Sequence, residues 1–207
     1  MNEMLDLVRR ITRQFVLEFI DDPYLCYTEH GLHALFFTHL FNALPPNRRF
    51  TTWNHKKVSV IQKEYPTAGN LGKPQRQHWD IAVIKTPPSS IFATGKHSFD
   101  YLRLSTVVEF GMNESEEHLV DDIERICHPD SNVDLGIIVH LYRLSKSGAK
   151  LSGRDWPAKS KRILTKEDIA MIGRDRLVEI YFGLSDSTGT YKSGAWLIYN
   201  NSNEALQ

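Results

Sequence analysis

Three strand-like segments follow one another between residues 58 and 110, and each carries a single acid among apolar and β-branched neighbours. The segments are residues 58–65, 78–84 and 104–110, and their acids are Glu64, Asp80 and Glu109. An ionised carboxylate in an apolar strand is costly to desolvate unless a cation, a hydrogen-bond donor or water compensates it. Three such acids at strand ends favour a shared counter-ion. The pattern predicts a divalent-metal site on a small sheet.

A helix and a further strand follow and indicate the fold class. Asn113 with Glu116 resembles a capping box, and apolar residues at three- and four-residue steps continue the helix to Cys127. Residues 132–142 are almost continuously apolar, which is typical of a strand covered on both faces. A strand, a helix and a strand in this order predict a right-handed parallel crossover. We therefore predict an α/β fold, a mixed β-sheet flanked by helices.

The remaining segments complete this architecture. Helical periodicity predicts one helix from Met4 to Asp21 and another from Thr28, its expected N-cap, to Ala43. Thr165 with Asp168 predicts a short C-terminal helix, followed by strands at 177–184 and 190–199 and a frayed tail from Asn200. The predicted order is two helices, three strands, a helix and a strand, then a helix and two strands.

Length and composition favour one domain spanning residues 1–207. Within it we expect N-terminal helices at 1–44, a core at 57–142, a basic loop at 144–162 and a C-terminal helix and hairpin at 163–199. Cys26 and Cys127 stand alone, which argues against a disulfide framework and suggests a reducing, cytoplasmic setting. No apolar run is long enough to cross a bilayer.

The chain contains 25 lysines and arginines and 25 aspartates and glutamates, so its formal net charge is zero. Any nucleic-acid contact must therefore come from local basic clusters. Aromatic residues interleave with basic ones between residues 47 and 57, a composition that suits phosphate contact and base stacking but also an ordinary solvated loop. The candidate nucleic-acid-binding residues there and in the next connection are Arg48, Arg49, Lys56, Lys57, Lys73 and Arg76.

The ordered segments YTEHGLHALFFTHL, QHWDIAVI and STVVEFGMN resemble the PD-(D/E)XK nuclease superfamily, the fold of many restriction endonucleases, over about residues 28–142. The resemblance implies a metal-dependent phosphodiesterase acting on DNA, restriction-like or DNA-processing, and a possible homodimer. It also implies Mg²⁺ or Mn²⁺ held by Asp80 and Glu109, with help from Glu29 and with Glu64 as a further ligand. Hard oxygen ligands of this kind suit Mg²⁺.

The family pattern places a lysine two residues after the glutamate, and this chain has Gly111 there. A lysine from elsewhere could replace it: Lys63, which adjoins Glu64 but faces away on a regular strand, Lys73 or Lys85. A second metal, with Glu64 or Glu114 as ligand, could also do so. Alternatively, the chain is a catalytically inactive domain that binds nucleic acid or a protein partner.

A purely structural α/β domain with no metal site is the third hypothesis. It predicts that the acids pair with Lys73, Arg76, Lys57 or Arg103. Glu29 and His33 lie one turn apart on one helix face, where they could pair with each other or point at the acids. His33 and His39, on an apolar helix, are expected to be core or interface residues rather than ligands.

Overall fold

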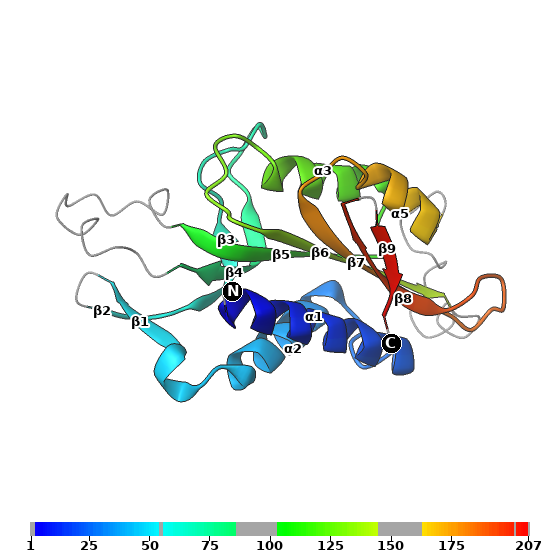
Figure 1. The fold of residues 1–207 in the computed structure, drawn as a ribbon, viewed down its shortest axis with the longest axis horizontal. Coiled ribbons are helices and arrows are strands. Elements are labelled where there is room, and N and C mark those ends of the chain that lie inside the picture. The colour runs from blue at the N-terminus through cyan, green and yellow to red at the C-terminus, as the bar shows by residue number, and fades with distance from the viewer. Residues whose placement is uncertain (1–2, 54–55, 86–102, 145–162, 201, 207) are drawn as a thin grey trace.

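A seven-stranded mixed sheet runs through the molecule in the order β3-β4-β5-β6-β7-β8-β9. The computed structural model describes residues 3–53, 56–85, 103–144, 163–200 and 202–206 (Figure 1). The three central strands β5, β6 and β7 are parallel, and the outer pairs are antiparallel. The strands are β3 (Ile61–Pro66), β4 (His78–Ile84), β5 (Leu104–Met112), β6 (Gly136–Leu144), β7 (Val178–Asp186), β8 (Gly194–Tyr199) and β9 (Ser202–Ala205).

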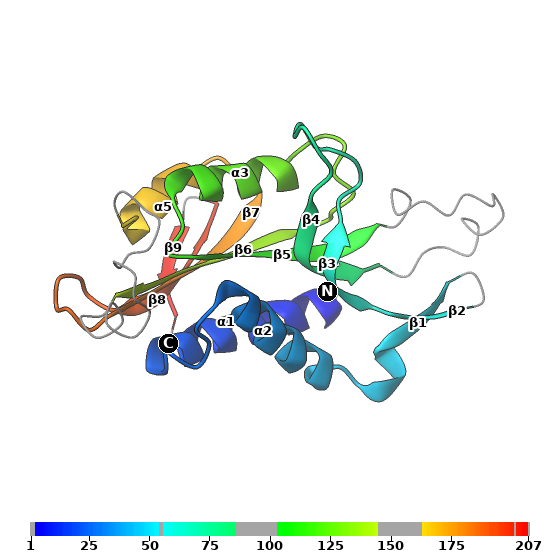
Figure 2. The ribbon, with the colours of Figure 1, turned by 180° about the vertical axis from the view of Figure 1, so that it is seen from behind.

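Helices cover both faces of this sheet, which gives a three-layer α/β arrangement (Figures 1 and 2). α1 (Glu3–Asp21) and α2 (Glu29–Ala43) pack on one face, and α3 (Glu116–Ile126) and α5 (Lys166–Ile172) on the other. Because helices cover both sides, every residue of β6 and every residue of β5 except Met112 is buried. The predicted fold class, a mixed sheet flanked by helices, is confirmed, as is the parallel pairing of β5 with β6.

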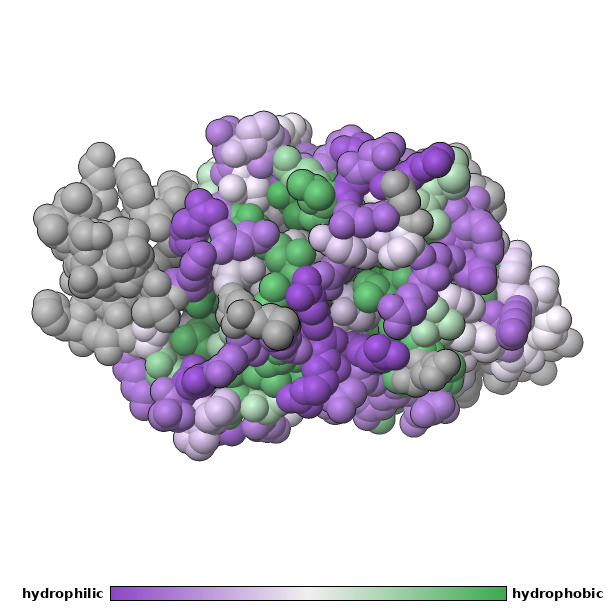
Figure 3. Space-filling model, in the orientation of Figure 1, coloured by the Kyte–Doolittle hydropathy of each residue, from purple (hydrophilic) through white to green (hydrophobic). Residues whose placement is uncertain are grey.

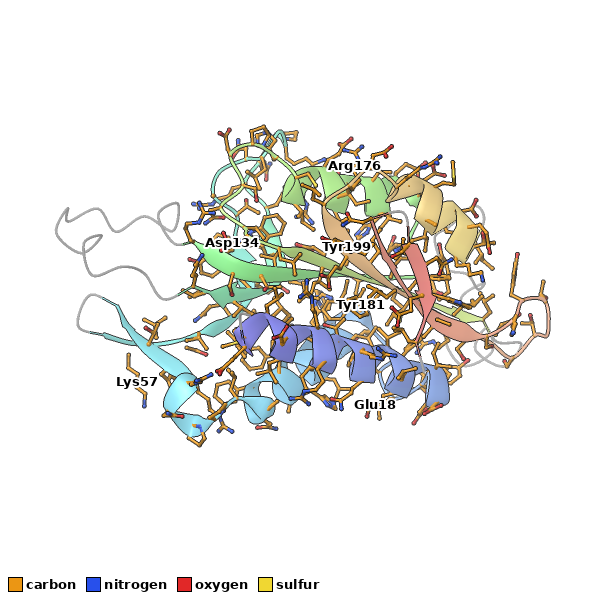
Figure 4. All side chains as sticks on the ribbon, viewed as in Figure 1. Glu18, Lys57, Asp134, Arg176, Tyr181 and Tyr199 are labelled. Atoms are coloured by element: carbon orange, nitrogen blue, oxygen red, sulfur yellow. The ribbon has the colours of Figure 1, made fainter. Side chains whose placement is uncertain are left out.

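A partly buried ion pair joins α1 to the sheet. Arg9 Nε donates to Glu179 Oε1 over 2.9 Å, and Glu179 on β7 is 3% exposed. The hydroxyl of Tyr181, labelled in Figure 4, lies 3.5 Å from Glu179 Oε2. A carboxylate buried this deeply needs a cation and a donor, and Arg9 and Tyr181 supply them.

The helix starts follow local capping chemistry. Thr28 Oγ1 accepts from Gly31 N–H, and Thr165 forms the predicted capping box with Asp168. The N-cap of α3 is Ser115 rather than the predicted Asn113. Asn113 instead takes a positive φ of 57°, and its Oδ1 accepts from Arg143 N–H. This residue therefore turns the chain out of β5 and ties the turn to β6.

Two predictions about strands are wrong. The segment 58–65 is not one strand, because β2 (Lys56–Ser59) ends before β3 begins and pairs instead with β1 (Phe50–Trp53) in a separate two-stranded sheet after the short helix η1 (Pro46–Arg48). The tail is not frayed, because β9 pairs with β8 and Leu206 is 8% exposed. The basic loop at 144–162 and the connection at 86–100 fall almost entirely outside the described residues. Within the described chain, no helix has both the length and the apolarity to cross a bilayer.

Candidate functional site

The pairing of β4 with β5 stops short of the end of β5, and acids occupy the position where it stops. The pairing extends as far as Ile81 with Val108, whereas β5 continues beside β6 to Met112. The backbone N–H of Phe110 donates to Asp80 Oδ2 over 2.8 Å, and that of Met112 donates to Glu29 Oε2 over 3.0 Å. Carboxylates from β4 and α2 therefore satisfy backbone donors on β5 where the β4 ladder has ended.

Glu64 approaches from the other side of Asp80. In the β3–β4 pairing Lys63 faces Ile81 and Tyr65 faces Trp79, so Glu64 lies between them, opposite Asp80. Its φ of 52° is in the left-handed region, which breaks the regular alternation of β3. The Glu64 side chain is 51% exposed, compared with 18% for Asp80. Glu64 therefore forms the solvent-facing side of the site.

Glu109 lies at the buried end of the same group. Burial, Asp122 and Asp80 raise its pKa well above the ordinary value, whereas Arg125 acts in the opposite direction. Burial also raises the pKa of Asp80 to about 7, against the hydrogen bond from Phe110 and with contributions from other nearby acids. The acids that influence one another in this way form what we call the acid cluster: Glu29, Glu64, Asp80, Glu109 and Asp122.

The cation that contacts the buried end of the acid cluster is Arg125 of α3. Its Nη2 lies 2.6 Å from Asp122 Oδ1 and 3.2 Å from Glu109 Oε2, and its guanidinium lies 5.3 Å from the Trp79 ring centroid. Burial is the largest cause raising the pKa of Asp122, and His118 and Arg125 oppose it. Sequence reasoning missed both Asp122 and Arg125. A signal was present, because both occupy positions close to the apolar stripe of the helix.

His33 is buried, as predicted, but its ring also reaches the acid cluster. Its Nδ1 lies 3.5 Å from Asp80 Oδ1 and 3.8 Å from Glu64 Oε1, and neither ring nitrogen makes a hydrogen bond. Burial and the positive charge of Lys63 lower the pKa of His33 to about 3, so the ring is neutral at physiological pH. The sequence leaves two alternatives for Glu29 and His33, pairing with each other or pointing at the acids. Both side chains point at the acids. Lys63 lies close enough for its charge to act on His33.

A histidine fills the space beside Gly111. Gly111 on β5 pairs with His140 on β6, and a Cβ built at Gly111 would lie 3.1 Å from His140 Nδ1. His140 is fully buried and neither nitrogen makes a hydrogen bond. Burial and the charge of His118 lower its pKa to about 3. This position therefore holds a neutral imidazole beside a bare backbone.

Two of the three lysines considered above, Lys73 and Lys85, pair with acids outside the acid cluster. Lys73 pairs with Asp121 of α3, and Lys85 Nζ lies 2.7 Å from Asp134 Oδ2. Asp134, labelled in Figure 4, also binds Arg103 at 2.6 Å. The charge of Lys63 acts on His33, which contacts the acid cluster, and the charge of Lys73 acts on Asp122 within the cluster.

The predicted nucleic-acid-binding residues are distributed over two segments. Around η1 and the small sheet, Arg48 pairs with Glu3, Arg49 Nε donates to Leu44 O over 3.0 Å, and Lys57 lies over the Phe50 ring at 4.2 Å (Figure 4). On the β3–β4 connection, Lys73 pairs with Asp121 and Arg76 donates to Thr67 O. The Lys56 side chain lies outside the described residues. The face of the molecule in Figure 3 mixes hydrophilic and apolar residues. Phosphate contact by these residues stays a prediction.

Comparison with protein-family models, with curated proteins and with solved structures finds no match for this chain. The site must therefore be assessed from its own chemistry. Carboxylate oxygens and a neutral imidazole are ligands for divalent cations, and here they converge from α2, β3, β4 and β5. The donor set therefore fits a divalent cation.

Proposed function

We propose that this chain is a metal-dependent phosphodiesterase that acts on DNA. The observation that supports the proposal is the convergence of acids from α2, β3, β4 and β5 at the point where β4 stops pairing with β5. Asp80, Glu109 and Glu64 would hold the cation, with Glu29 assisting. A divalent cation held by these residues would supply activation of water and neutralisation of charge on the phosphate oxygens.

The protein groups around this centre have separable tasks. The Phe110 N–H fixes one oxygen of Asp80 and leaves the other near His33. Arg125 holds the Glu109 carboxylate from the α3 side, where both side chains are almost fully buried. Glu64 is the exposed acid, so the phosphate of a substrate approaches from its side of the cluster. Lys63 is next to Glu64 and its charge acts on His33, so we assign contact with that phosphate to Lys63.

The second candidate function, a cleavage-inactive domain that binds nucleic acid or a protein partner, is favoured by a specific observation. His140 occupies the space beside Gly111, and Arg125 contacts the Glu109 carboxylate. A binding domain needs no group that deprotonates water, and it keeps its buried acids paired. The position of His140 and the contact of Arg125 with Glu109 therefore fit a fold that is retained only to bind nucleic acid or a protein partner.

Cleavage of plasmid and single-stranded DNA, measured with Mg²⁺ and with Mn²⁺, distinguishes the two candidates. The variants are Asp80→Asn and Glu109→Gln, which remove the charge and keep the size of each side chain. The amide at position 80 also keeps an oxygen that can accept the Phe110 N–H. Asp134→Asn is the matched control, since Asp134 binds Lys85 and Arg103 instead. We expect wild type and the control to cut and the two cluster variants to lose activity.

Each other outcome of this assay has a definite meaning. Equal cleavage by all four proteins overturns the assignment of catalysis to Asp80 and Glu109. If wild type does not cut but retains DNA with a steep salt dependence, the DNA-binding candidate replaces the nuclease, because phosphate contacts release counterions. If it neither cuts nor retains DNA at low salt, both nucleic-acid functions are excluded.

A further inference from the structure

The acid cluster includes a nitrogen donor that hydrogen bonding does not explain. His33 is 1% exposed, and both of its ring nitrogens are buried without a hydrogen-bond partner. Buried polar groups in proteins are nearly always hydrogen-bonded, so an orphaned pair in one ring needs an explanation. The ring lies against Phe110 at a centroid distance of 5.0 Å, which holds it in place but satisfies neither nitrogen.

The distances around His33 Nδ1 match those between ligands of a single ion. Two atoms bound to one metal at about 2.1 Å lie about 3 to 4.2 Å apart. His33 Nδ1 is 3.5 Å from Asp80 Oδ1 and 3.8 Å from Glu64 Oε1. A neutral imidazole cannot form an ion pair with either carboxylate, whereas a cation between them would bind all three atoms.

His30 adds a second nitrogen from the same helix. One donor atom from each of His30, His33 and Glu64 can be chosen so that all three lie within 4.8 Å of one another. His30 and Glu64 are exposed and His33 is buried, so the ion would enter from solvent and bind against a fixed inner ligand. Glu64 has a positive φ, and its carboxylate lies on this side of β3, 3.8 Å from His33 Nδ1.

We propose that His33, His30 and Glu64, joined by Asp80, form a mixed imidazole and carboxylate site that selects a first-row transition ion over Mg²⁺. Mg²⁺ prefers all-oxygen surroundings and retains several waters, whereas imidazole favours transition ions such as Co²⁺ and Zn²⁺. The inference rests on the proposed function for its catalytic meaning, since it names the cofactor of that site. Binding itself is measured without DNA.

Isothermal titration of the metal-free full chain with Co²⁺, Mn²⁺ and Mg²⁺ tests the proposal. We expect Co²⁺ to bind at least about tenfold more tightly than Mg²⁺. His33→Gln and Glu64→Gln should each weaken Co²⁺ binding by at least about tenfold, in the range seen when groups that support a metal are removed. His39→Gln is the matched control, because His39 is on the same helix but pairs with Glu18 at 3.6 Å.

A spectroscopic measurement keeps the test valid if His33→Gln folds poorly. Electron spin echo modulation of bound Mn²⁺ should show coupling to imidazole nitrogen in wild type and in the His39→Gln control. The coupling should decrease in His30→Gln, which alters an exposed side chain and should leave the fold intact. Thermal unfolding of each variant without metal checks the fold.

The inference and the proposed function can fail separately. Equal affinity for Mg²⁺ and Co²⁺, or absence of nitrogen coupling, overturns the inference even if DNA is cut. Co²⁺ binding that responds to His33 and Glu64 but not to His39 supports the inference even if no DNA is cut. Equal weakening in His39→Gln overturns the assigned ligands.

Discussion

Arg125 should hold the buried part of the acid cluster together in the absence of metal, and Arg125→Met tests this directly. Its guanidinium lies 2.6 Å from Asp122 and 3.2 Å from Glu109, and the three side chains are 8%, 4% and 4% exposed. Removing one partner of a buried ion pair generally costs about 3–5 kcal/mol, because it leaves a charge without compensation. Methionine keeps most of the apolar stem, so the change isolates the charge.

In Arg125→Met the acid cluster can replace the lost positive charge by binding one more proton. The cost of binding this proton sets the size of the stability loss. The ordinary pKa of a glutamate is 4.5. At pH 7, holding such a group protonated in the folded state costs about 3 kcal/mol relative to the unfolded chain, where it has this ordinary pKa, at about 1.4 kcal/mol for each pH unit above that value. At pH 5 the same protonation costs less than about 1 kcal/mol. The variant's folded state binds the extra proton, so its deficit grows as pH rises and shrinks as pH falls.

Urea unfolding followed by tryptophan fluorescence measures this deficit in metal-free buffer. We expect Arg125→Met to lower the free energy of unfolding by about 3 kcal/mol at pH 7 and by much less at pH 5. Adding Glu109→Gln to Arg125→Met should recover most of the loss, and Arg125→Lys should lose less than Arg125→Met. A loss that is the same at both pH values, or no recovery in the double variant, would refute the reasoning.

Three further predictions concern other parts of the sheet. Burial lowers the pKa of His140 to about 3, so below pH 6.5 the unfolded chain binds a proton that the folded chain does not, and the free energy of unfolding falls as pH falls. His140→Phe should reduce the pH dependence of the free energy of unfolding by about 1.4 kcal/mol per pH unit, measured by urea unfolding between about pH 6 and 4. Gly111→Lys should destabilise the chain by about 1–3 kcal/mol, because its Cβ meets His140 at 3.1 Å, and should do so less in a His140→Ala background; equal loss in both backgrounds would contradict this. Leu206→Ala should lower stability by about 2 kcal/mol in thermal unfolding, whereas a frayed tail would show no change.

The parts of the fold that could be predicted are those with strong local periodicity. The strands β4, β5 and β6 are apolar enough to be recognised, and a helix between β5 and β6 requires them to be parallel. The proximity of Asp80 and Glu109 also follows, since both lie on adjacent strands near the same end. What could not be predicted is where β4 and β5 stop pairing, because that depends on three-dimensional contacts with α2.

The residues and strands that the sequence patterns did not reveal depend on tertiary contacts rather than on local periodicity. Asp122 and Arg125 are polar residues near the buried face of α3, and their role depends on the rotation of that helix over β5. The hairpin of β1 and β2 is short and basic, and β9 is exposed throughout, so neither shows the alternation of a half-buried strand. His33 could be predicted to be buried, and pointing at the acids was one of two alternatives for it, but the sequence did not decide between them or identify Asp80 and Glu64 as the acids it faces.

The hydrogen bonds from Phe110 and Met112 to acid side chains provide a reporter of site occupancy within the backbone. A cation bound to Asp80 or Glu29 would withdraw electron density from the oxygens that these two amides contact. The amide proton frequencies of Phe110 and Met112 should therefore shift during a metal titration, together and ahead of distant residues. The backbone would thus record the charge at the end of the sheet without any change to the ligands themselves.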